Sequence, residues 1–352
     1  MGYEPNELPL LHSAIYLKTQ LKFESEYSLM SFIRTLISPN AIQIWDCKYI
    51  VVSLQTKFIM NHQSGFVSII GKPNVGKSTL LNALIGEKIS IISPKVQTTR
   101  HRIMGILSNE KYQIVFSDTP GIIEPRYKLQ GSMMQFVNES LEDADVVLFI
   151  TDMDERNHDA DLLEKIKLIK TPLIVLINKI DLSQNEKVLL KIEELREKLG
   201  CENILPISAL SKFNIGSIVQ HILTHLKEAP SFFPDDQLTD KSERFIASEI
   251  LREKIMMHYK EEIPYSVQVD ITEFLDEPDI IRIMAEIYVM RDSQKQIMIG
   301  KGGIALRNTG TAARRDMENF FGKKVFLKTF VKVKEDWRDN DRMLKQFGYN
   351  NK

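Results

Sequence analysis

The sequence predicts an α/β protein in which a mostly parallel sheet with helices on both faces is followed by a smaller α+β domain. From residue 65 on, short apolar runs alternate with polar or helical stretches, and this alternation is typical of parallel strands connected by helices. After residue 241 the predicted order changes to helix, strand, strand, helix, glycine-rich loop, helix and strand. A chain of 352 residues is long enough for two or three domains that each bury a core.

The composition alone does not identify a binding partner, but it narrows the cellular compartment. Lys and Arg number 46 and Asp and Glu number 47, which gives a formal net charge of −1 and requires no polyanion partner. Cys47 and Cys201 lie far apart and lack the spacing of a metal or redox motif, which suits a reducing compartment. No apolar run approaches the ~18–20 residues of a membrane span. We therefore expect a soluble, cytoplasmic chain without a transmembrane segment.

Residues 1–62 have no sustained hydrophobic period and lie outside the two predicted domains. Acidic residues such as Glu4 and Glu24 argue against an organellar transit peptide, and no charged start leads into an apolar core as in a secretory signal. Two interpretations stay open, an appended and disordered segment or an over-extended start with translation beginning at Met60. We favour the second, which an intact-mass measurement of the native protein tests.

Five short apolar runs predict the strands of the first domain, which we place at residues 63–228. They are Gly65–Ile70, Tyr112–Ser117, Val146–Ile150, Leu173–Ile177 and Ile204–Ile207. A last helix, Ile215–Leu226, ends this domain. Because ligands bind beyond the carboxyl ends of the strands in such sheets, the residues that follow each strand form the candidate site.

A glycine-rich segment between the first strand and a predicted helix matches the phosphate-loop pattern GxxxxGKS. Its residues are Gly71, Lys72, Pro73, Asn74, Val75, Gly76, Lys77 and Ser78, and Thr79 follows them. The glycines let successive backbone N–H groups approach a polyphosphate closely. We expect Lys77 to reach the β- and γ-phosphates and the Ser78 hydroxyl to bind Mg²⁺. The sequence therefore predicts a Mg²⁺-dependent nucleoside triphosphate site.

Three further segments follow predicted strands in the order of a guanine nucleotide site. They are Asp118, Thr119, Pro120 and Gly121 after the second strand, Asn178, Lys179 and Asp181 after the fourth, and Ser208 and Ala209 after the fifth. An acid such as Asp118 can hold Mg²⁺, usually through water, and the Gly121 N–H can contact the γ-phosphate. Asp181 can accept hydrogen bonds from N1–H and the exocyclic amine of guanine, a donor pattern that adenine lacks. The backbone of Ser208 and Ala209 can contact the base O6, so we predict a site for GTP and GDP.

In this order the segments resemble the five motifs of translation-factor-related GTPases. The stretch Gln97-Thr98-Thr99-Arg100-His101-Arg102 is similar to the switch region of Era-type GTPases in particular. The resemblance implies that Thr99 closes on Mg²⁺ and the γ-phosphate, that residues 90–105 form a first switch, and that the residues after Gly121 form a second. It assigns catalysis to Lys77, Thr99, Asp118 and Gly121, and the metal to Ser78, Thr99 and Asp118.

Residue 122 departs from the pattern of Ras-type enzymes, which carry a water-orienting Gln there. Ile122 cannot hydrogen-bond a water, so we expect slow intrinsic hydrolysis, with the water positioned by backbone groups, another residue or a partner. The side-chain carbonyl of Asn74 is a candidate ligand for K⁺ beside the phosphates, where the cation would supply the charge of an arginine finger. Equal hydrolysis rates in Na⁺ and K⁺ would count against this hypothesis.

A linker at residues 229–241, marked by two prolines and an acid pair, precedes the second domain at residues 242–352. The pattern predicts a helix over residues 242–260 that Ser242 caps and Pro264 stops, then strands Tyr265–Phe274 and Ile280–Met290, helices Ser293–Ile299 and Ile304–Phe320, and strand Lys324–Val333.

The order of these elements resembles a type II KH domain, whose G-x-x-G loop clamps the backbone of about four single-stranded nucleotides. The loop residues here are Ile299, Gly300, Lys301, Gly302 and Gly303. Glycines let the backbone and the next helix N-terminus approach phosphate, and Lys301 adds a charge. From Arg291 on, 15 Lys and Arg stand against seven Asp and Glu, an excess that suits RNA. A second nucleotide site and a plain helix–helix turn are the alternatives for this loop.

A phosphate-loop GTPase domain, a linker and a KH domain form the architecture of Era-type GTPases, which residues 65 to about 349 resemble. Val331-Lys332-Val333-Lys334 and Trp337 also look like that family. The resemblance implies a protein that binds 16S rRNA near its 3′ end and assists 30S ribosomal subunit assembly, and we expect it to be a monomer. The resemblance also implies loose, peripheral attachment to the cytoplasmic face of the membrane.

Two other functions stay open at this point. The C-terminal domain could bind a protein or a membrane, which would make the chain a nucleotide-gated regulator. An ATP-dependent kinase could use the same phosphate loop, but Asp181 speaks against it because an adenine enzyme has no need of that carboxylate.

Overall fold

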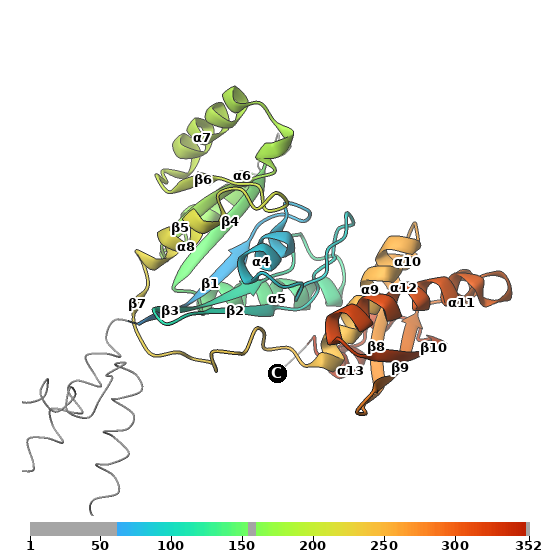
Figure 1. The fold of residues 1–352 in the computed structure, drawn as a ribbon. Helices are drawn as coiled ribbons and strands as arrows, with labels where there is room; N and C mark the ends of the chain where they lie inside the picture. Colours follow the sequence, from blue (N-terminus) through green and yellow to red (C-terminus); the bar gives the residue numbers. More distant parts are fainter. Residues whose placement is uncertain (1–61, 154–159, 350–352) are drawn as a thin grey trace, which may run out of the picture. The chain divides into compact units, whose positions relative to one another are not determined.

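The computed structural model describes residues 62–153 and 160–349 and contains two sheets. The first is made of β1 (Gln63–Ile70), β2 (Ile103–Ser108), β3 (Tyr112–Asp118), β4 (Val146–Asp152), β5 (Leu173–Asn178), β6 (Ile204–Pro206) and the short β7 (Lys227–Glu228). Its order is β2-β3-β1-β4-β5-β6, with β7 beside β1. Pairing is parallel from β3 to β6, whereas β2 is antiparallel to β3 and β7 to β1. This is the mostly parallel sheet that the sequence predicts (Figure 1).

Helices cover both faces of this sheet because successive side chains of a strand point to opposite faces. They are α4 (Lys77–Ile85), α5 (Lys128–Glu142), α6 (Ala160–Lys167), α7 (Asn185–Leu199) and α8 (Ile215–Leu223), with a 3₁₀ turn η1 (Ile180–Leu182). Along β4, Leu148 belongs to the core with α4 and α8, and its neighbour Phe149 belongs to the core with α5, α6 and α7. The strand ends are therefore held between two apolar layers.

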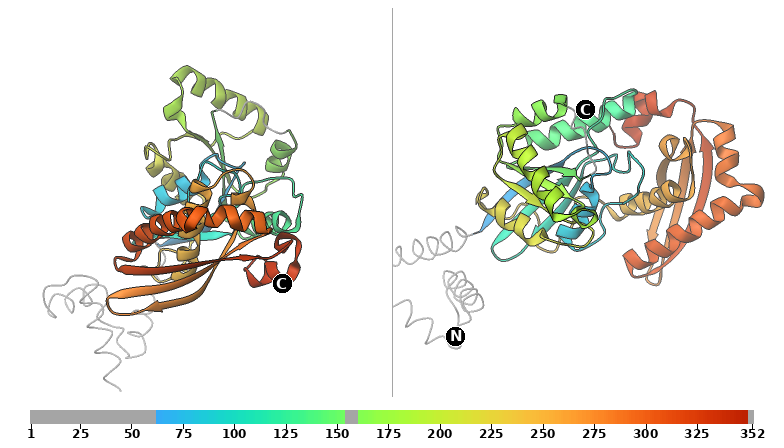
Figure 2. Two further views of the ribbon diagram at one scale, coloured as in Figure 1. Left: turned by 90° about the vertical axis from the view of Figure 1, so that its right-hand side faces the viewer. Right: turned by 90° about the horizontal axis from the view of Figure 1, so that it is seen from above.

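The second sheet contains β8 (Gln268–Asp276), β9 (Ile280–Val289) and β10 (Lys324–Val333) in the order β10-β9-β8. β9 is parallel to β10 and antiparallel to β8. The helices of this domain are α9 (Glu243–His258), α10 (Ile263–Ser266), α11 (Asp292–Ile299) and α12 (Ile304–Phe321), and η2 (Lys301–Gly303) precedes α12. Figure 2 shows the helices of this domain lying against one face of its sheet. Leu251, Met298 and Ala313, from α9, α11 and α12, share one core with the inward side chains of the sheet.

The chain then crosses to the other face of the second sheet. There η3 (Trp337–Asp339) and α13 (Asp341–Gln346) follow β10. Trp337 and Phe347 pack with Tyr288, an outward residue of β9, so this tail covers one part of that face.

The element predictions differ from the structure in a few places for physical reasons. β2 is absent from the predicted strands because its run is short, contains Gly105, and overlaps the residues that we assign to a switch. The strand expected at Tyr265 begins at Gln268, because Pro264 lies in the first turn of α10, where a proline fits. α9 thus ends at His258, before the proline expected to stop it, while Ser242 caps it as predicted by accepting a hydrogen bond from the Phe245 N–H. α8 ends three residues earlier than expected. The predictions for residues 1–61 lie outside the described residues.

The segment between the two domains is attached to the first sheet rather than free. Ile106 N–H donates to the Leu238 carbonyl at 2.9 Å, and the Thr239 hydroxyl donates to the Met104 carbonyl at 2.6 Å. Earlier in the same segment, the backbone N–H groups of Phe232 and Phe233 donate to the side-chain oxygen of Gln113 on β3. Residues 238–239 therefore occupy the open edge of β2.

Within residues 62–153 and 160–349, no helix combines the length and hydropathy that a membrane span requires.

Candidate functional site

The loop between β1 and α4 is held in its shape by glycine and by a lysine that folds back over it. Gly76 has φ 102°, and a Cβ there would lie 2.2 Å from the Asn178 amide nitrogen, so no other residue fits. The Lys77 ammonium donates to the carbonyls of Gly71 at 3.1 Å and Lys72 at 2.8 Å. The loop backbone thus curls over the Lys77 ammonium. This arrangement suits the binding of a polyphosphate.

Three hydroxyls surround one carboxylate where β3 ends beside α4. Ser78 Oγ donates to Asp118 Oδ2 at 2.6 Å, and Ser90 Oγ donates to the same oxygen at 2.8 Å. Thr99 Oγ1 lies 2.8 Å from Ser78 Oγ, whereas the Thr98 hydroxyl turns away and donates to the Lys95 carbonyl. The structure therefore brings Ser78, Asp118 and Thr99 together, and it adds Ser90, which sequence reasoning missed.

The other carboxylate oxygen of Asp118 has the environment of a cation ligand. Oδ1 is buried and has no hydrogen-bond partner in the part of the chain that the structure describes. Oxygen donors from a carboxylate and hydroxyls are the ligands that Mg²⁺ takes in nucleotide sites. No cluster of three or more His, Cys, Asp and Glu residues with metal-binding geometry occurs within the described ranges. The residues fit a Mg²⁺ ion whose remaining ligands come from phosphate and water.

Burial shifts both charged groups of this end of the site toward neutrality. It lowers the pKa of Lys77 to about 8, an effect that the nearby Asp118 charge opposes. Burial also raises the pKa of Asp118, against the hydrogen bond from Ser78 and the charge of Lys77. A bound polyphosphate and its cation would supply each group with an opposite charge.

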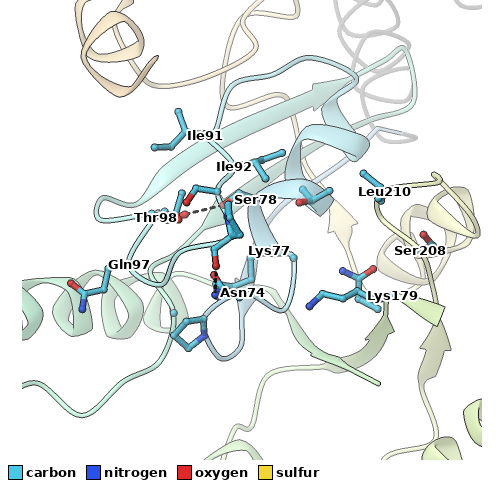
Figure 3. Close-up of a pocket in the computed structure, with 18 of the residues that line it drawn as sticks. Asn74, Lys77, Ser78, Ile91, Ile92, Gln97, Thr98, Lys179, Ser208 and Leu210 are labelled. Carbon is cyan, nitrogen blue, oxygen red and sulfur yellow. Dashed lines mark hydrogen bonds between the residues drawn. The ribbon is translucent and has the colours of Figure 1, made fainter. Parts of the chain in front are cut away.

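A cavity of about 430 Å³ extends from this cluster to the ends of β5 and β6. Figure 3 shows Lys77 and Ser78 near one end and Lys179, Ser208 and Leu210 near the other. The site predicted from the strand ends is therefore one continuous space, long enough for phosphates at one end and a base at the other.

Asn178 joins the two ends of this cavity. Its amide donates to the Val75 carbonyl at 2.8 Å and its side-chain oxygen accepts from the Ala209 N–H at 2.9 Å. The Ala209 N–H that we expect at the base O6 is therefore already engaged with Asn178. Lys179 forms an ion pair with Asp152 at 2.5 Å, and the exposed Asp181 lines the rim.

The residues after Asp118 pack closely against the phosphate loop. A Cβ on Gly121 would lie 2.7 Å from the Pro73 backbone nitrogen, so the two segments touch there. The Ile122 N–H donates to the Gly71 carbonyl at 3.1 Å, and the Ile122 side chain packs against the apolar core with α5, α6 and α7. The Asn74 amide donates to the Pro94 carbonyl at 2.9 Å.

The second candidate site is the turn between α11 and α12. Gly300, Gly302 and Gly303 have φ angles of 70°, 62° and 76°, which glycine adopts without strain. A Cβ on Gly300 would lie 2.7 Å from the Ala305 Cβ, whereas Gly302 faces open space and Lys301 is exposed. The turn therefore presents bare backbone and one cation directly before the N-terminus of α12.

The segment at residues 88–102, which holds Thr99, contacts the second domain directly. Arg100 is fully buried. Its guanidinium donates to the Val267 carbonyl at 2.6 Å and to the Pro264 carbonyl at 3.0 Å. One side chain beside the phosphate cluster thus binds the backbone around α10.

Two buried charged residues of α9 hold the same segment from the other side. Arg252 donates to the Thr98 carbonyl. Glu253 accepts from the Lys88 ammonium at 2.7 Å and from the Ile92 N–H at 3.0 Å. Sequence reasoning missed these contacts, because charged residues of an amphipathic helix normally face solvent.

Comparison with known proteins finds matches to both domains. The model for 50S ribosome-binding GTPases matches residues 66–179, and the KH domain model matches residues 262–338. GTPase Era of Alkaliphilus metalliredigens (strain QYMF) is 46% identical over 295 residues, which are 82% of this chain and 100% of that protein.

Two solved structures of Era are also similar. One is Era in complex with MgGDPNP and nucleotides 1506–1542 of 16S ribosomal RNA, with 43% identity, a TM-score of 0.79, and coverage of 82% of this chain and 99% of that chain. The other is a variant of Aquifex aeolicus Era bound to GDP·AlF4⁻, with 44% identity, a TM-score of 0.78 and the same coverage. This chain, a GTPase with a C-terminal KH domain, belongs to the Era family.

Proposed function

We propose that this GTPase is a nucleotide-controlled switch that binds 16S rRNA near its 3′ end through its KH domain and assists assembly of the 30S ribosomal subunit. The observation that carries the proposal is the similarity, over 82% of the chain, to an Era structure that holds MgGDPNP and a 16S rRNA fragment together. GTP would order the segments around Thr99 and Gly121, and hydrolysis would release them.

The phosphate end of the cavity would hold the triphosphate and its metal. The loop from Gly71 to Thr79 would surround the phosphates with N–H groups, and Lys77 would leave the carbonyls of Gly71 and Lys72 to bind the β- and γ-phosphates. Ser78, Thr99 and Asp118 would hold Mg²⁺, Asp118 through a water molecule. Bound Mg²⁺ supplies positive charge to the β- and γ-phosphate oxygens.

The other end of the cavity would select guanine. Asp181 stands at the rim with its carboxylate exposed to accept from the base N1–H and amine. Asn178 and Lys179 fix the base-side loops through Val75, Ala209 and Asp152, while Ser208 and Ala209 border the base O6. An adenine in this place would leave the carboxylate without donors.

Hydrolysis would be slow without a partner or a cation. The Ile122 side chain packs into a core and offers no hydrogen bond to water. The Gly121 N–H would contact the γ-phosphate, and the Asn74 oxygen is a candidate ligand for K⁺ because its amide nitrogen already bonds to the Pro94 carbonyl. A faster turnover in K⁺ than in Na⁺ is the expected result.

The turn from Ile299 to Gly303 would clamp the RNA backbone. Its glycines leave no side chain between phosphate and the N–H groups, and the exposed Lys301 adds a charge. We infer a cytoplasmic site of action, since the 30S subunit is the proposed partner. A monomeric state and peripheral attachment to the membrane stay predictions.

Crosslinking of the full chain to RNA in cells that produce it, followed by sequencing, tests this proposal. Reads concentrated at the 3′ end of 16S rRNA, and absent from a sample without crosslinking, are the expected result. Reads scattered over unrelated RNAs would overturn the rRNA assignment. Recovery of a protein or lipid partner in place of RNA would favour a nucleotide-gated regulator instead.

A further inference from the structure

One strand of the second domain has an outward face of alternating lysine and phenylalanine. Val325 and Val331 of β10 point into the core that the domain shares with α11 and α12. Because successive side chains of a strand point to opposite faces, every second residue points away from that core. These outward residues, which we call the β10 strip, are Lys324, Phe326, Lys328, Phe330 and Lys332.

The two phenyl rings of the strip are open to solvent. Phe326 is 46% exposed and Phe330 is 41% exposed. The C-terminal tail covers the neighbouring Tyr288 on the same face of the sheet, but it leaves both rings open. Exposed apolar rings that lie in a row on a folded surface indicate a site of interaction with another molecule.

Cations accompany both rings. The Lys328 ammonium lies 5.1 Å from the centre of the Phe330 ring, and the Arg282 guanidinium lies 5.8 Å from the centre of the Phe326 ring. Arg282 also pairs with Glu277 at 3.0 Å. The rings therefore lie within a basic environment.

Acidic groups on this face are neutralised or lie at the far edge. Lys332 pairs with Glu286, while neither Lys324 nor Lys328 has an ion pair within the parts of the chain that the structure describes. Two carboxylates of this face lie instead on β8, at the opposite edge of the sheet, as Asp270 and Glu273, which stand beside the outward residues Glu286 and Met284 of β9. The face thus changes from acidic at β8 to basic at β10.

Lysine alone has another explanation, because lysines on an edge strand prevent the pairing of sheets between molecules. β10 is such an edge strand among the described residues. That role gives no reason for Phe326 and Phe330, whose exposure increases the tendency of an edge to associate. A ligand that takes both rings and cations accounts for the whole pattern.

We propose that the β10 strip is a second contact for single-stranded RNA, on the face of the sheet opposite to the helices that carry the glycine-rich turn. Bases stack on aromatic rings without regard to sequence, and lysines between the rings neutralise the phosphates that connect them. With ~3.3 Å per residue the rings stand about 13 Å apart, which leaves room for nucleotides between two stacked bases. The inference rests on the proposed RNA-binding function and extends the bound length of RNA.

A membrane surface is the less suitable occupant. A membrane-binding face gathers its apolar side chains into one continuous patch, whereas Phe326 and Phe330 are separated by Lys328. Single-stranded RNA alternates base and phosphate along its length, as the strip alternates ring and cation.

The test compares the affinity of the full chain for two unstructured RNAs, one of about 6 nucleotides that fills the turn and one of about 20 that exceeds it. The double variant Phe326→Leu/Phe330→Leu keeps apolar side chains but loses the rings. We expect it to bind the longer RNA about tenfold or more weakly and the shorter RNA as the wild type does. Phe320→Leu, at an equally exposed ring of α12, is the matched control.

A charge variant gives an independent measure. Lys324→Gln/Lys328→Gln is expected to reduce the salt dependence of the longer RNA's affinity by about two phosphate contacts and to leave that of the shorter RNA unchanged. Unchanged GTP turnover and melting temperature show that the variants fold.

The outcomes separate this inference from the proposed function. If the wild type binds neither RNA, the proposed function fails. If it binds both and the Leu variant matches it on the longer RNA, only the β10 strip is refuted. A variant that loses binding to anionic phospholipid vesicles, or changes from dimer to monomer by sedimentation, while keeping its RNA affinity also overturns the inference.

Discussion

Among single residues, Asp118 shows what a buried charge requires of its surroundings. Its Oδ2 accepts from Ser78 and Ser90, while the buried Oδ1 has no partner in the described structure. A buried polar atom without a partner costs about 1–3 kcal/mol. A metal-bound water at Oδ1 would remove this cost, so metal and nucleotide together are expected to stabilise the folded chain.

Asp118→Asn is therefore expected to uncouple Mg²⁺ from nucleotide. The amide occupies the same volume but carries no charge for a metal-bound water. In the wild type, Mg²⁺ should raise GTP affinity, and in the variant the affinities with and without Mg²⁺ should converge, as calorimetry would measure. Asp235→Asn, at an exposed carboxylate of the linker, should behave as the wild type. A full Mg²⁺ effect in the variant would contradict the assignment.

We assign base selection to a single carboxylate, Asp181, at the rim of the cavity. Asp181→Asn replaces an acceptor pair by one acceptor and one donor, which suits xanthine rather than guanine. GTP affinity should fall about 100-fold or more and xanthosine triphosphate should bind instead. Competition binding with the two nucleotides measures the change, and an unaltered preference for GTP would remove Asp181 from the base site.

Sequence reasoning names residues that the structure brings together where each of them follows a strand. Ser78 and Asp118 are brought together by the parallel pairing of β1 and β3, which the apolar runs predict. Ser90 could not be predicted, because it belongs to no motif and reaches Asp118 only through the course of the loop after α4.

Among the elements, the turn between α11 and α12 combines a special backbone with an open surface. Gly302 has φ 62° and faces no neighbour within 4 Å. Gly302→Asp adds strain and a negative charge where phosphate is expected, so RNA affinity should fall by at least tenfold while GTP turnover persists. Gly200→Asp, also at a left-handed glycine with open space but in the GTPase domain, is the control. Equal losses in both variants would indicate a general effect of strain or charge.

A stacked aromatic cluster connects the segment before β2 to the C-terminal tail. The His101 ring stacks on Tyr349 at 4.2 Å and meets Phe245 edge-on at 5.4 Å. The sequence predicts no elements after Val333, since the apolar residues there are few and their partners, such as Tyr288 and His101, lie far away in the sequence.

Burial lowers the pKa of His101 well below its ordinary value of 6.5, and the charges of Arg252, Lys241 and Arg100 lower it further. Because the folded-state pKa is depressed, the unfolded chain takes up this proton first, and stability decreases as the pH falls below about 6.5. His101→Phe should make the melting temperature less dependent on pH between about 7.5 and 5. His225→Phe is the comparison variant, and an equally steep pH dependence in His101→Phe would refute the prediction.

In the whole molecule, the two domains are joined by charged side chains without access to water. Arg100 and Arg252 are 0% and 1% exposed. The sequence could not predict this interface, because a buried arginine cannot be told from a solvated one by helical period alone. In the structure, the interface is marked by two buried carboxylates on α9, Glu249 and Glu253, which are four residues apart and face the same side.

Arg252→Lys should weaken the coupling between nucleotide and RNA. Lysine keeps the charge but lacks the planar fork that reaches both Glu249 and the Thr98 carbonyl. The ratio of RNA affinities in the GTP and GDP states should move toward one, from the 5- to 150-fold typical of coupled sites. Arg244→Lys, exposed on the same helix, is the matched control. An unchanged ratio would show that the coupling runs elsewhere.

The attachment of residues 238–239 to β2 has a consequence for how strong the contacts between the domains need to be. With this stretch bound to the sheet edge, the free tether before α9 shrinks to a few residues. A tether so short keeps the KH domain at a high effective concentration beside the GTPase domain. Each contact around Arg100 can therefore contribute little free energy and still form. The binding or hydrolysis of one nucleotide is then enough to form or release such a contact.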